Sequence, residues 1–193
     1  MKTMTRTIVL AAAIVMALGL ATRALAVTVV TYHPDPTQYG SGWTDSTSKY
    51  DGSIRWSSSS AGRGWIYFQV NSPQWPADSV KLDFLEAVDT GNCPFTFRVV
   101  DPTVNPLTAQ PGILYHAIYT GFTAGYDRDS DTVPCWHHDT LNTAQWRPPY
   151  YPPGTFTCIG FYAPFQPSTG GAGWADGWGT GNSEPTLDFF YHP

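Results

Sequence analysis

Charged residues are scarce in this chain. Lysine, arginine, aspartate and glutamate make up 13% of its 193 residues, and glutamate occurs only as Glu86 and Glu184. Aromatic residues reach 15%, and there are 18 glycines and 17 prolines. Because charged helix formers are few and turn formers are many, the composition argues against a helical protein and favours short strands joined by long loops.

The chain also lacks an apolar run long enough to span a bilayer. Its most apolar segment, residues 8–20, follows the basic residues Lys2 and Arg6 and precedes the small-residue signature ALA, which ends at Ala26. This order predicts a secretory signal peptide over residues 1–26. We therefore expect a secreted protein without membrane insertion, in which residues 27–193 form a single domain.

Basic residues become rarer still once the predicted signal peptide is removed. The chain carries 10 Lys and Arg against 15 Asp and Glu, and three of the basic residues lie within residues 1–26. Seven basic residues then face fifteen acidic ones, which is a net charge near −8. Such a surface disfavours nucleic acid and anionic membranes as partners.

Only three cysteines are present, Cys93, Cys135 and Cys158. In an oxidising compartment this number predicts one disulfide and one odd thiol, and three pairings are possible. We favour Cys135–Cys158, which would close a loop around the proline-rich residues 147–153. Cys93 is then interpreted as a small buried side chain.

The longest pattern of alternating side chains lies in residues 62–88. Ile66 and Phe68 point to one face of the first strand, and Trp65 and Tyr67 point to the other. Since both faces are apolar, we expect a central strand of a sheet. The opposing sheet would cover one face, and a long loop, taken from residues 121–154 or 164–185, would cover the other.

Similar runs recur along the chain and predict an all-β fold. We expect an antiparallel β-sandwich of the jelly-roll type with eight or nine strands, long loops and no helix. Residues 80–88, the second strand of this pattern, are expected to form a hairpin with the next strand, residues 95–99. The expected strands are residues 27–32, 53–57, 65–70, 80–88, 95–99, 113–120, 155–163 and 186–191, with a short one near 139–141.

Four segments of the chain follow the order of a known family. They are residues 38–41 (QYGS), 63–68 (RGWIYF), 77–84 (ADSVKLDF) and 182–191 (NSEPTLDFFY). Together they resemble the DNRLRE-type secreted modules, which are jelly rolls akin to galactose-binding-like sandwiches. Gln69 stands where these modules usually have Asp, and residues 121–154 have no counterpart. The resemblance implies binding to carbohydrate or to a cell surface, and it names no ligand set.

Aromatic residues gather in the predicted loops. Exposed tryptophan and tyrosine rings suit the C–H face of a sugar, and a nearby carboxylate can bind its hydroxyls. The alternative is that these rings fold back and cap the ends of the sandwich. The candidate ligand-binding residues are Trp43, Trp136, Trp146, Tyr150, Tyr151, Trp174, Asp176 and Trp178.

Two further groups of side chains are candidates for ion binding. Asp127, Asp129 and Asp131 alternate, as ligands do in calcium loops, although a solvated acidic loop has the same composition. Residues 135–139 (CWHHD) contain possible transition-metal ligands, but a disulfide at Cys135 would remove the thiolate, and adjacent histidines on an extended segment point in opposite directions.

Glu86 is the one carboxylate that the alternation directs inward. It follows Val80, Leu82 and Phe84 at the same spacing. A buried glutamate there would be of catalytic interest, whereas a bulge or the end of the strand before residue 86 would leave it exposed.

These features lead to three functional hypotheses. The first is a secreted, non-catalytic module that binds carbohydrate or polysaccharide through loop aromatics. The second is a structural or self-associating extracellular or cell-surface protein. The third is a glycan-active enzyme, which is disfavoured because no catalytic motif is present. No cofactor is expected apart from a structural calcium ion.

Overall fold

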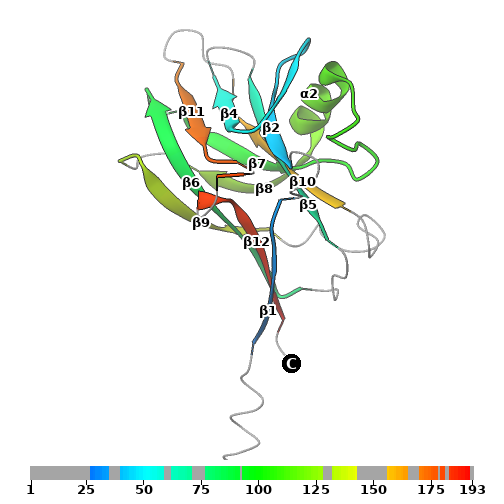
Figure 1. Ribbon diagram of the computed structural model, residues 1–193, viewed down its shortest axis with the longest axis vertical. Helices are drawn as coiled ribbons and strands as arrows, with labels where there is room; N and C mark the ends of the chain where they lie inside the picture. The colour runs from blue at the N-terminus through cyan, green and yellow to red at the C-terminus, as the bar shows by residue number, and fades with distance from the viewer. Residues whose placement is uncertain are drawn as a thin grey trace, which may run out of the picture.

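Two antiparallel sheets pack face to face, as the computed structural model in Figure 1 shows. The first, which we call the β6 sheet, contains β1 (Thr28–Tyr32), β4 (Ile54–Ser57), β6 (Ser79–Thr90), β9 (Cys135–Leu141), β11 (Ala172–Ala175) and β12 (Thr186–Tyr191). The second, the β5 sheet, contains β2 (Ser41–Thr44), β3 (Lys49–Asp51), β5 (Arg63–Gln69), β7 (Phe95–Val99), β8 (Phe122–Asp127) and β10 (Phe156–Tyr162).

The structure describes ten stretches of the chain. They contain twelve strands, more than the eight or nine expected, and one helix, α2 (Pro111–Thr120). The predicted signal peptide lies outside them. The described residues are 27–34, 40–58, 62–70, 77–91, 93–127, 132–142, 156–164, 170–177, 179–180 and 183–191.

Strand β6 organises the first sheet because it is long enough to hold three partners. One side of its first half pairs with β12, the same side of its second half pairs with β11, and its other side pairs with β9. Strand β4 extends the sheet beyond β11, and β1 extends it beyond β12. The β5 sheet runs in the order β3-β2-β5-β10-β7-β8.

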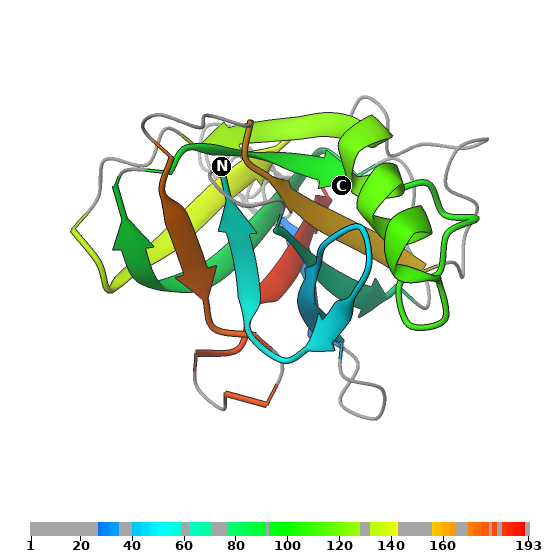
Figure 2. The same ribbon diagram turned by 90° about the horizontal axis from the view of Figure 1, so that it is seen from above.

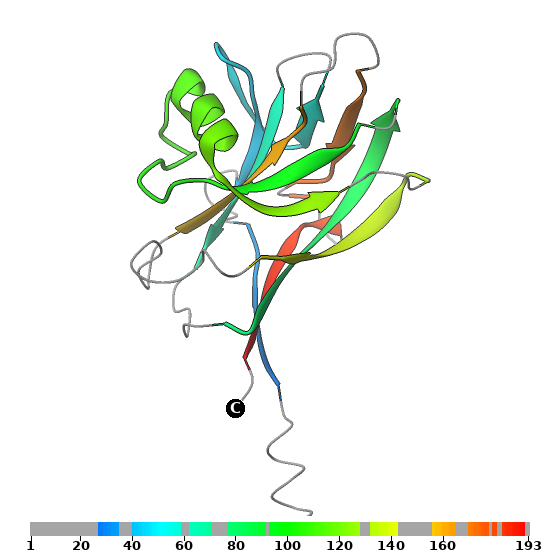
Figure 3. The same ribbon diagram turned by 180° about the vertical axis from the view of Figure 1, so that it is seen from behind.

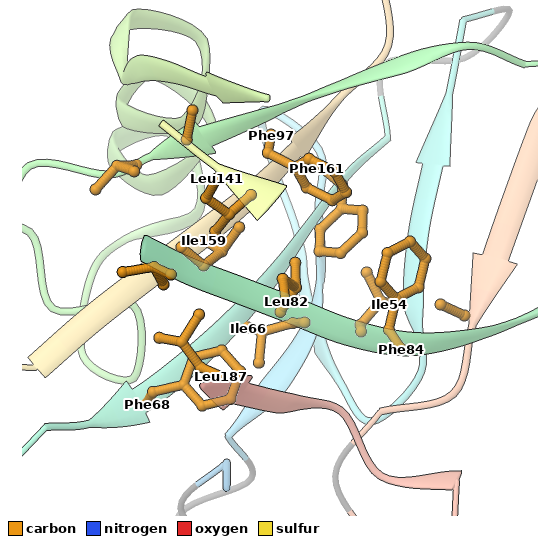
Figure 4. Close-up of a cluster of buried hydrophobic side chains, with 14 of the residues drawn as sticks. Ile54, Ile66, Phe68, Leu82, Phe84, Phe97, Leu141, Ile159, Phe161 and Leu187 are labelled. Carbon is orange, nitrogen blue, oxygen red and sulfur yellow. The ribbon is translucent and has the colours of Figure 1, made fainter. Parts of the chain in front are cut away.

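The alternation in the sequence correctly predicts which side chains face the core. Ile66 and Phe68 of β5 lie between the sheets, as do Leu82 and Phe84 of β6 (Figure 4). Val80 of β6 belongs to the same buried cluster. Strands β7 and β12 contribute alternate residues to the same cluster. Phe84, Phe95, Phe97 and Phe161 pack edge to face or tilted against one another, with ring centroids 5.2–6.2 Å apart.

Strand β5 is central, as expected, but its second face is covered by helix α2 and not by a long loop. Trp65 and Tyr67 lie in a separate apolar cluster with Leu114, Ala117 and Ile118 of the helix. Figure 2 shows the helix lying against the outside of the sandwich. The second face of β5 is therefore covered without the long loops expected from residues 121–154 or 164–185.

The expected strand at residues 113–120 is therefore wrong. The helix begins with Pro111 at its first turn, where a missing N–H is tolerated, and Leu114, Ala117 and Ile118 are spaced as one helical face requires. A Cβ on Gly160 of β10 would lie 2.7 Å from a methyl carbon of Ile118, so glycine at 160 lets the helix approach the sheet. No helix among the described residues is long and apolar enough to cross a membrane.

The hairpin expected between residues 80–88 and 95–99 is also wrong. Strand β6 belongs to one sheet and β7 to the other, where β7 pairs with β10 and β8. Strands β6 and β7 lie on opposite sides of one core, and each buries alternate side chains in it. Two neighbouring strands of a hairpin would show the same alternation in the sequence. The chain therefore crosses between the sheets through the connection that contains the buried Cys93.

Four strands lie in segments expected to be loops. Strands β2 and β3 form a hairpin within residues 37–52, β8 lies within residues 121–154, and β11 lies within residues 164–185. Gly173 of β11 sits against the ring of Trp56, which a Cβ at that position would approach to 2.3 Å. Glycine is thus required there for close packing, and it also weakens the strand signal in the sequence.

The Cys135–Cys158 disulfide is not formed. Cys135 lies on β9 in the β6 sheet, whereas Cys158 lies on the outer face of the β5 sheet, in the cluster covered by α2. The two thiols are on different layers of the sandwich, so the predicted pairing of Cys135 with Cys158 is wrong. Burial raises the pKa of the Cys158 thiol.

Strands β1 and β12 project below the body of the sandwich (Figures 1 and 3). They pair along their full length, from Thr28 opposite Tyr191 to Tyr32 opposite Leu187. The outward side chain of Val29 is 47% exposed. Among the described strands β1 has β12 as its only partner, so no described strand covers its other edge.

Candidate functional site

The outer face of the β6 sheet carries a row of large side chains across three strands. Trp174 of β11 lies directly opposite Arg55 of β4 on one side and Val88 of β6 on the other. Residues opposite each other in antiparallel strands share a face. Because Ala175, the next residue of β11, is buried in the core, Trp174, Arg55 and Val88 point outward.

Arg55 links this row to the edge of the other sheet. Its guanidinium lies 4.7 Å from the ring centroid of Trp174 and 5.3 Å from that of Trp43 on β2. Trp43 in turn stacks on Tyr50, with the ring centroids 4.2 Å apart and the planes 16° from parallel. Tyr50 is 47% exposed. The cation is therefore held between two tryptophans, an arrangement favoured by the negative potential of the ring faces.

A third tryptophan lies on the same face of the sheet, on the far side of β6. Trp136 of β9 is opposite Leu85 of β6 and is 44% exposed. Leu85 also accepts a backbone hydrogen bond of 2.9 Å from Asp176, the residue that follows β11. The row that contains Trp136 thus adjoins the row that contains Trp174. We call Trp43, Arg55, Trp174 and Trp136 the tryptophan face.

A polar pair borders Trp136. Nδ1 of the exposed His138 lies 3.0 Å from Oδ1 of Asp83, the residue opposite it on β6. The rings of His138 and Trp136 are close to parallel, with centroids 6.5 Å apart. Aromatic and polar groups are therefore adjacent on this part of the surface.

The structure brings together three of the predicted aromatic residues. Trp43, Trp136 and Trp174 were expected in loops and lie on strands, and Asp176 is half-buried directly after β11. The calcium prediction stays untested, since of its three carboxylates only the backbone of Asp127 is described, at the end of β8. Outside the described residues lie Trp146, Tyr150, Tyr151, Trp178, Asp129 and Asp131.

Arg55 and Tyr50 are functional residues that were not predicted from the sequence. A signal for Arg55 was present, because it alternates with the buried Ile54 and Trp56 in a short strand and must point outward. No pattern in the sequence shows that a residue of β4 meets Trp43 of the opposite sheet. That contact exists because the edges of the two sheets adjoin at β2 and β4 (Figure 2).

A second group of functional side chains lies inside the sandwich. Glu86 follows the inward alternation of β6 and is fully buried, so the strand does not end or turn outward before it. Nε2 of His137 on β9 lies 2.9 Å from Oε2 of Glu86 and 3.3 Å from Sγ of Cys135. Glu86 and residues 135–139 were predicted as separate candidates, and the structure joins Glu86, Cys135 and His137 in one cluster.

The geometry of this cluster differs from that of a nucleophilic relay. A cysteine–histidine–carboxylate relay places the thiol at one ring nitrogen and the carboxylate at the other, so that a proton can move between them. Here Cys135 and Glu86 both contact Nε2 of His137. The three donor atoms converge on a common point, and all of them lie within 4.8 Å of one another.

No family model and no curated protein match this chain. Similar solved structures include a family two carbohydrate esterase from Cellvibrio japonicus, with a TM-score of 0.32 and 9% identity over 86% of this chain and 34% of that one. TmCBM61 in complex with β-1,4-galactotriose has a TM-score of 0.31 and 10% identity over 87% of this chain and 83% of that one. CBM29_1, a family 29 carbohydrate binding module from Piromyces equi, has a TM-score of 0.32 and 10% identity over 84% and 91%.

These similarities are too low to carry an argument about function. The chain spans about a third of the length of the esterase. The resemblance to DNRLRE-type modules remains a prediction from the sequence. The residues of the tryptophan face and of the interior cluster are therefore the observations that bear on function.

Proposed function

We propose that this protein is a secreted, non-catalytic module that binds carbohydrate through the tryptophan face. The observation that supports this proposal most directly is that Trp174 and Trp136 lie on the outer face of the β6 sheet, with Trp43 beside Arg55 at the edge of that face, and that each ring is partly exposed. Soluble proteins tend to bury such large rings, and a group of them left in contact with solvent marks a binding surface.

The chemistry of the face suits a sugar. Aromatic ring faces pack against the apolar C–H face of a pyranose, while polar groups beside them bind its hydroxyls. Arg55 can supply N–H donors and Asp176 a carboxylate acceptor. Trp174 and Trp136 lie on strands separated by β6, so two strand spacings, about 10 Å, separate them across the sheet. This separation favours an oligosaccharide or polysaccharide chain over a single sugar.

The side chains of the face hold one another in place. Trp43 is stacked on Tyr50 and Arg55 lies between Trp43 and Trp174. Side chains already held in one orientation lose less conformational entropy on binding. The non-catalytic part of the proposal is supported by the convergence of Cys135 and Glu86 on one nitrogen of His137, which does not provide a proton relay.

Removing the rings is expected to weaken carbohydrate binding. We expect Trp174→Ala and Trp136→Ala each to reduce affinity for a retained polysaccharide by roughly tenfold, equivalent to about 1.4 kcal/mol. A glycan array would identify the ligand, and titration calorimetry would measure the loss. Tyr119→Ala is the matched control, because Tyr119 is 51% exposed on α2, which covers the other sheet. The proposal fails if the wild-type protein retains no glycan, or if both tryptophan variants bind as tightly as Tyr119→Ala.

Self-association is a second candidate function, and the observation that favours it is the projecting strand β1. No described strand covers one edge of it, and Val27 and Val29 are 41% and 47% exposed. Such an edge can pair with another chain. We expect the protein to form concentration-dependent oligomers in light scattering and Val29→Lys to stay monomeric, since a charge on an edge strand opposes pairing. A wild-type protein that stays monomeric at high concentration would argue against this function.

A further inference from the structure

We propose that Glu86, Cys135 and His137 form a binding site for a transition-metal ion of the zinc(II) type. This inference is independent of carbohydrate binding. It rests on the identity of the three donors, on their mutual distances and on the two paired strands that position them.

The backbone fixes the arrangement of the donors. Glu86 on β6 lies directly opposite Cys135 on β9, and His137 lies opposite Phe84, two residues along on the same face of the sheet. The β6–β9 pairing keeps one register from Val80 to Glu86, and β6 is also held by β12 and, with a register shift next to Glu86, by β11. Sites built on paired strands keep their geometry better than sites on loops.

The donor set selects a class of ion. A thiolate, an imidazole and a carboxylate are the three ligand types that zinc binds in proteins, whereas calcium and magnesium prefer oxygen alone. In a tetrahedral zinc site the sulfur and nitrogen would be about 3.5 Å apart, and the nitrogen and oxygen about 3.3 Å apart. The observed separations from Nε2 of His137 are 3.3 Å to Cys135 Sγ and 2.9 Å to Glu86 Oε2. These two separations would have to grow by a few tenths of an ångström to admit the ion, and the sulfur and the carboxylate oxygen, which lie within 4.8 Å of each other, would have to be about 3.6 Å apart.

A metal ion can contact the Cys135 sulfur, the His137 nitrogen and the Glu86 oxygen at the same time, which a single proton cannot do. One N–H at Nε2 of His137 can serve only one of its two neighbours well, whereas a metal ion attracts the sulfur, the nitrogen and the oxygen together. With three protein ligands, the fourth tetrahedral position would be open to water.

The surroundings hold the imidazole in place and leave the thiol within reach. The ring of His137 stacks on Phe84, with centroids 4.7 Å apart and planes 5° from parallel. Glu86 is fully buried and His137 is 6% exposed, while Cys135 is only half-buried at the start of an edge strand. A metal ion would therefore enter from the side of Cys135.

Cobalt(II) titration of the chelator-treated, reduced protein tests the site. We expect one equivalent of Co²⁺ to produce a thiolate-to-cobalt charge-transfer band and the visible bands of tetrahedral cobalt, and one equivalent of Zn²⁺ to abolish both. Cys135→Ser should lose the charge-transfer band, and His137→Gln should weaken Co²⁺ binding by at least tenfold. Two control variants should keep the band: Cys158→Ala, which removes the buried thiol of the other sheet, and His138→Gln, which removes the neighbouring exposed histidine.

A second measurement keeps the test decisive if a variant does not fold. Zn²⁺ should slow the alkylation of Cys135 in the wild-type protein by at least tenfold, as followed by mass spectrometry of the labelled peptide. The proposal is overturned if the wild type gives no thiolate band with Co²⁺ and Zn²⁺ does not protect Cys135. It is also overturned if the band survives in folded Cys135→Ser, or disappears in His138→Gln.

Discussion

Replacing Trp56 by alanine is expected to lower the free energy of unfolding by about 3–5 kcal/mol, the usual cost of removing a fully buried aromatic side chain. Trp56 has no exposed surface, and its ring centroid lies 4.4 Å from that of Phe95 and 5.4 Å from that of Phe161. Its Nε1 donates a hydrogen bond of 3.2 Å to the backbone oxygen of Cys93. The substitution removes packing between both sheets and leaves a buried acceptor without this donor. Urea denaturation followed by circular dichroism would measure the loss.

Two variants provide controls for this prediction. Trp56→Phe keeps most of the ring and should lose less stability than Trp56→Ala. Trp136→Ala removes a tryptophan that is 44% exposed, and it should cost less than about 1 kcal/mol. If the Trp56→Ala and Trp136→Ala variants were equally stable, Trp56 would not be the central packing residue that its burial indicates.

Removing one partner of the buried Glu86–His137 pair is expected to have an effect of similar size. In the presence of a chelator, His137→Leu should lower the free energy of unfolding by about 3–5 kcal/mol, because the carboxylate of Glu86 stays buried without its 2.9 Å contact to the imidazole. The double variant Glu86→Leu/His137→Leu should recover most of this loss, since an apolar pair of similar volume removes the cost of the buried charge. Chemical denaturation of the two single variants and the double variant gives the coupling free energy.

The exposed pair on the other face of the same strands is a matched control. His138 contacts Asp83 at 3.0 Å, and the side chain of His138 is 66% exposed. His138→Leu should therefore change the free energy of unfolding by at most about 1 kcal/mol. Strictly additive losses in the double variant of Glu86 and His137 would contradict an energetic coupling between the two side chains.

The core of the fold could be predicted from the sequence because alternation along a strand is a local property. Ile66, Phe68, Leu82 and Phe84 face the core as the period-2 pattern predicts, and Glu86 continues that pattern inward. The helix at residues 111–120 was missed because its β-branched and aromatic residues favour a strand. Packing against Trp65 and beside Gly160 stabilises the helix, and those contacts involve residues distant in the sequence.

The candidate sites were only partly predictable, for a related reason. Trp43, Trp174 and Trp136 could be chosen from their types and their surroundings, but Arg55 between two of them could not, because the contact joins strands of different sheets. The members of the interior cluster were predicted only separately, as Glu86 and residues 135–139, because the sequence does not show that β6 pairs with β9. The structure places Cys135 and Cys158 on different layers, so the thiol lies beside His137.

The class of the fold and the buried face of most strands follow from the pattern of residues along the chain. Which strands are neighbours depends on the tertiary structure. Alternation reports that one side of a strand is apolar, but it contains nothing about the strand that pairs with it, and strand order depends on contacts between distant segments. The pairing of β6 with β9 is therefore what joins Glu86 to Cys135 and His137. The pairing of β11 with β4 likewise sets Trp174 beside Arg55.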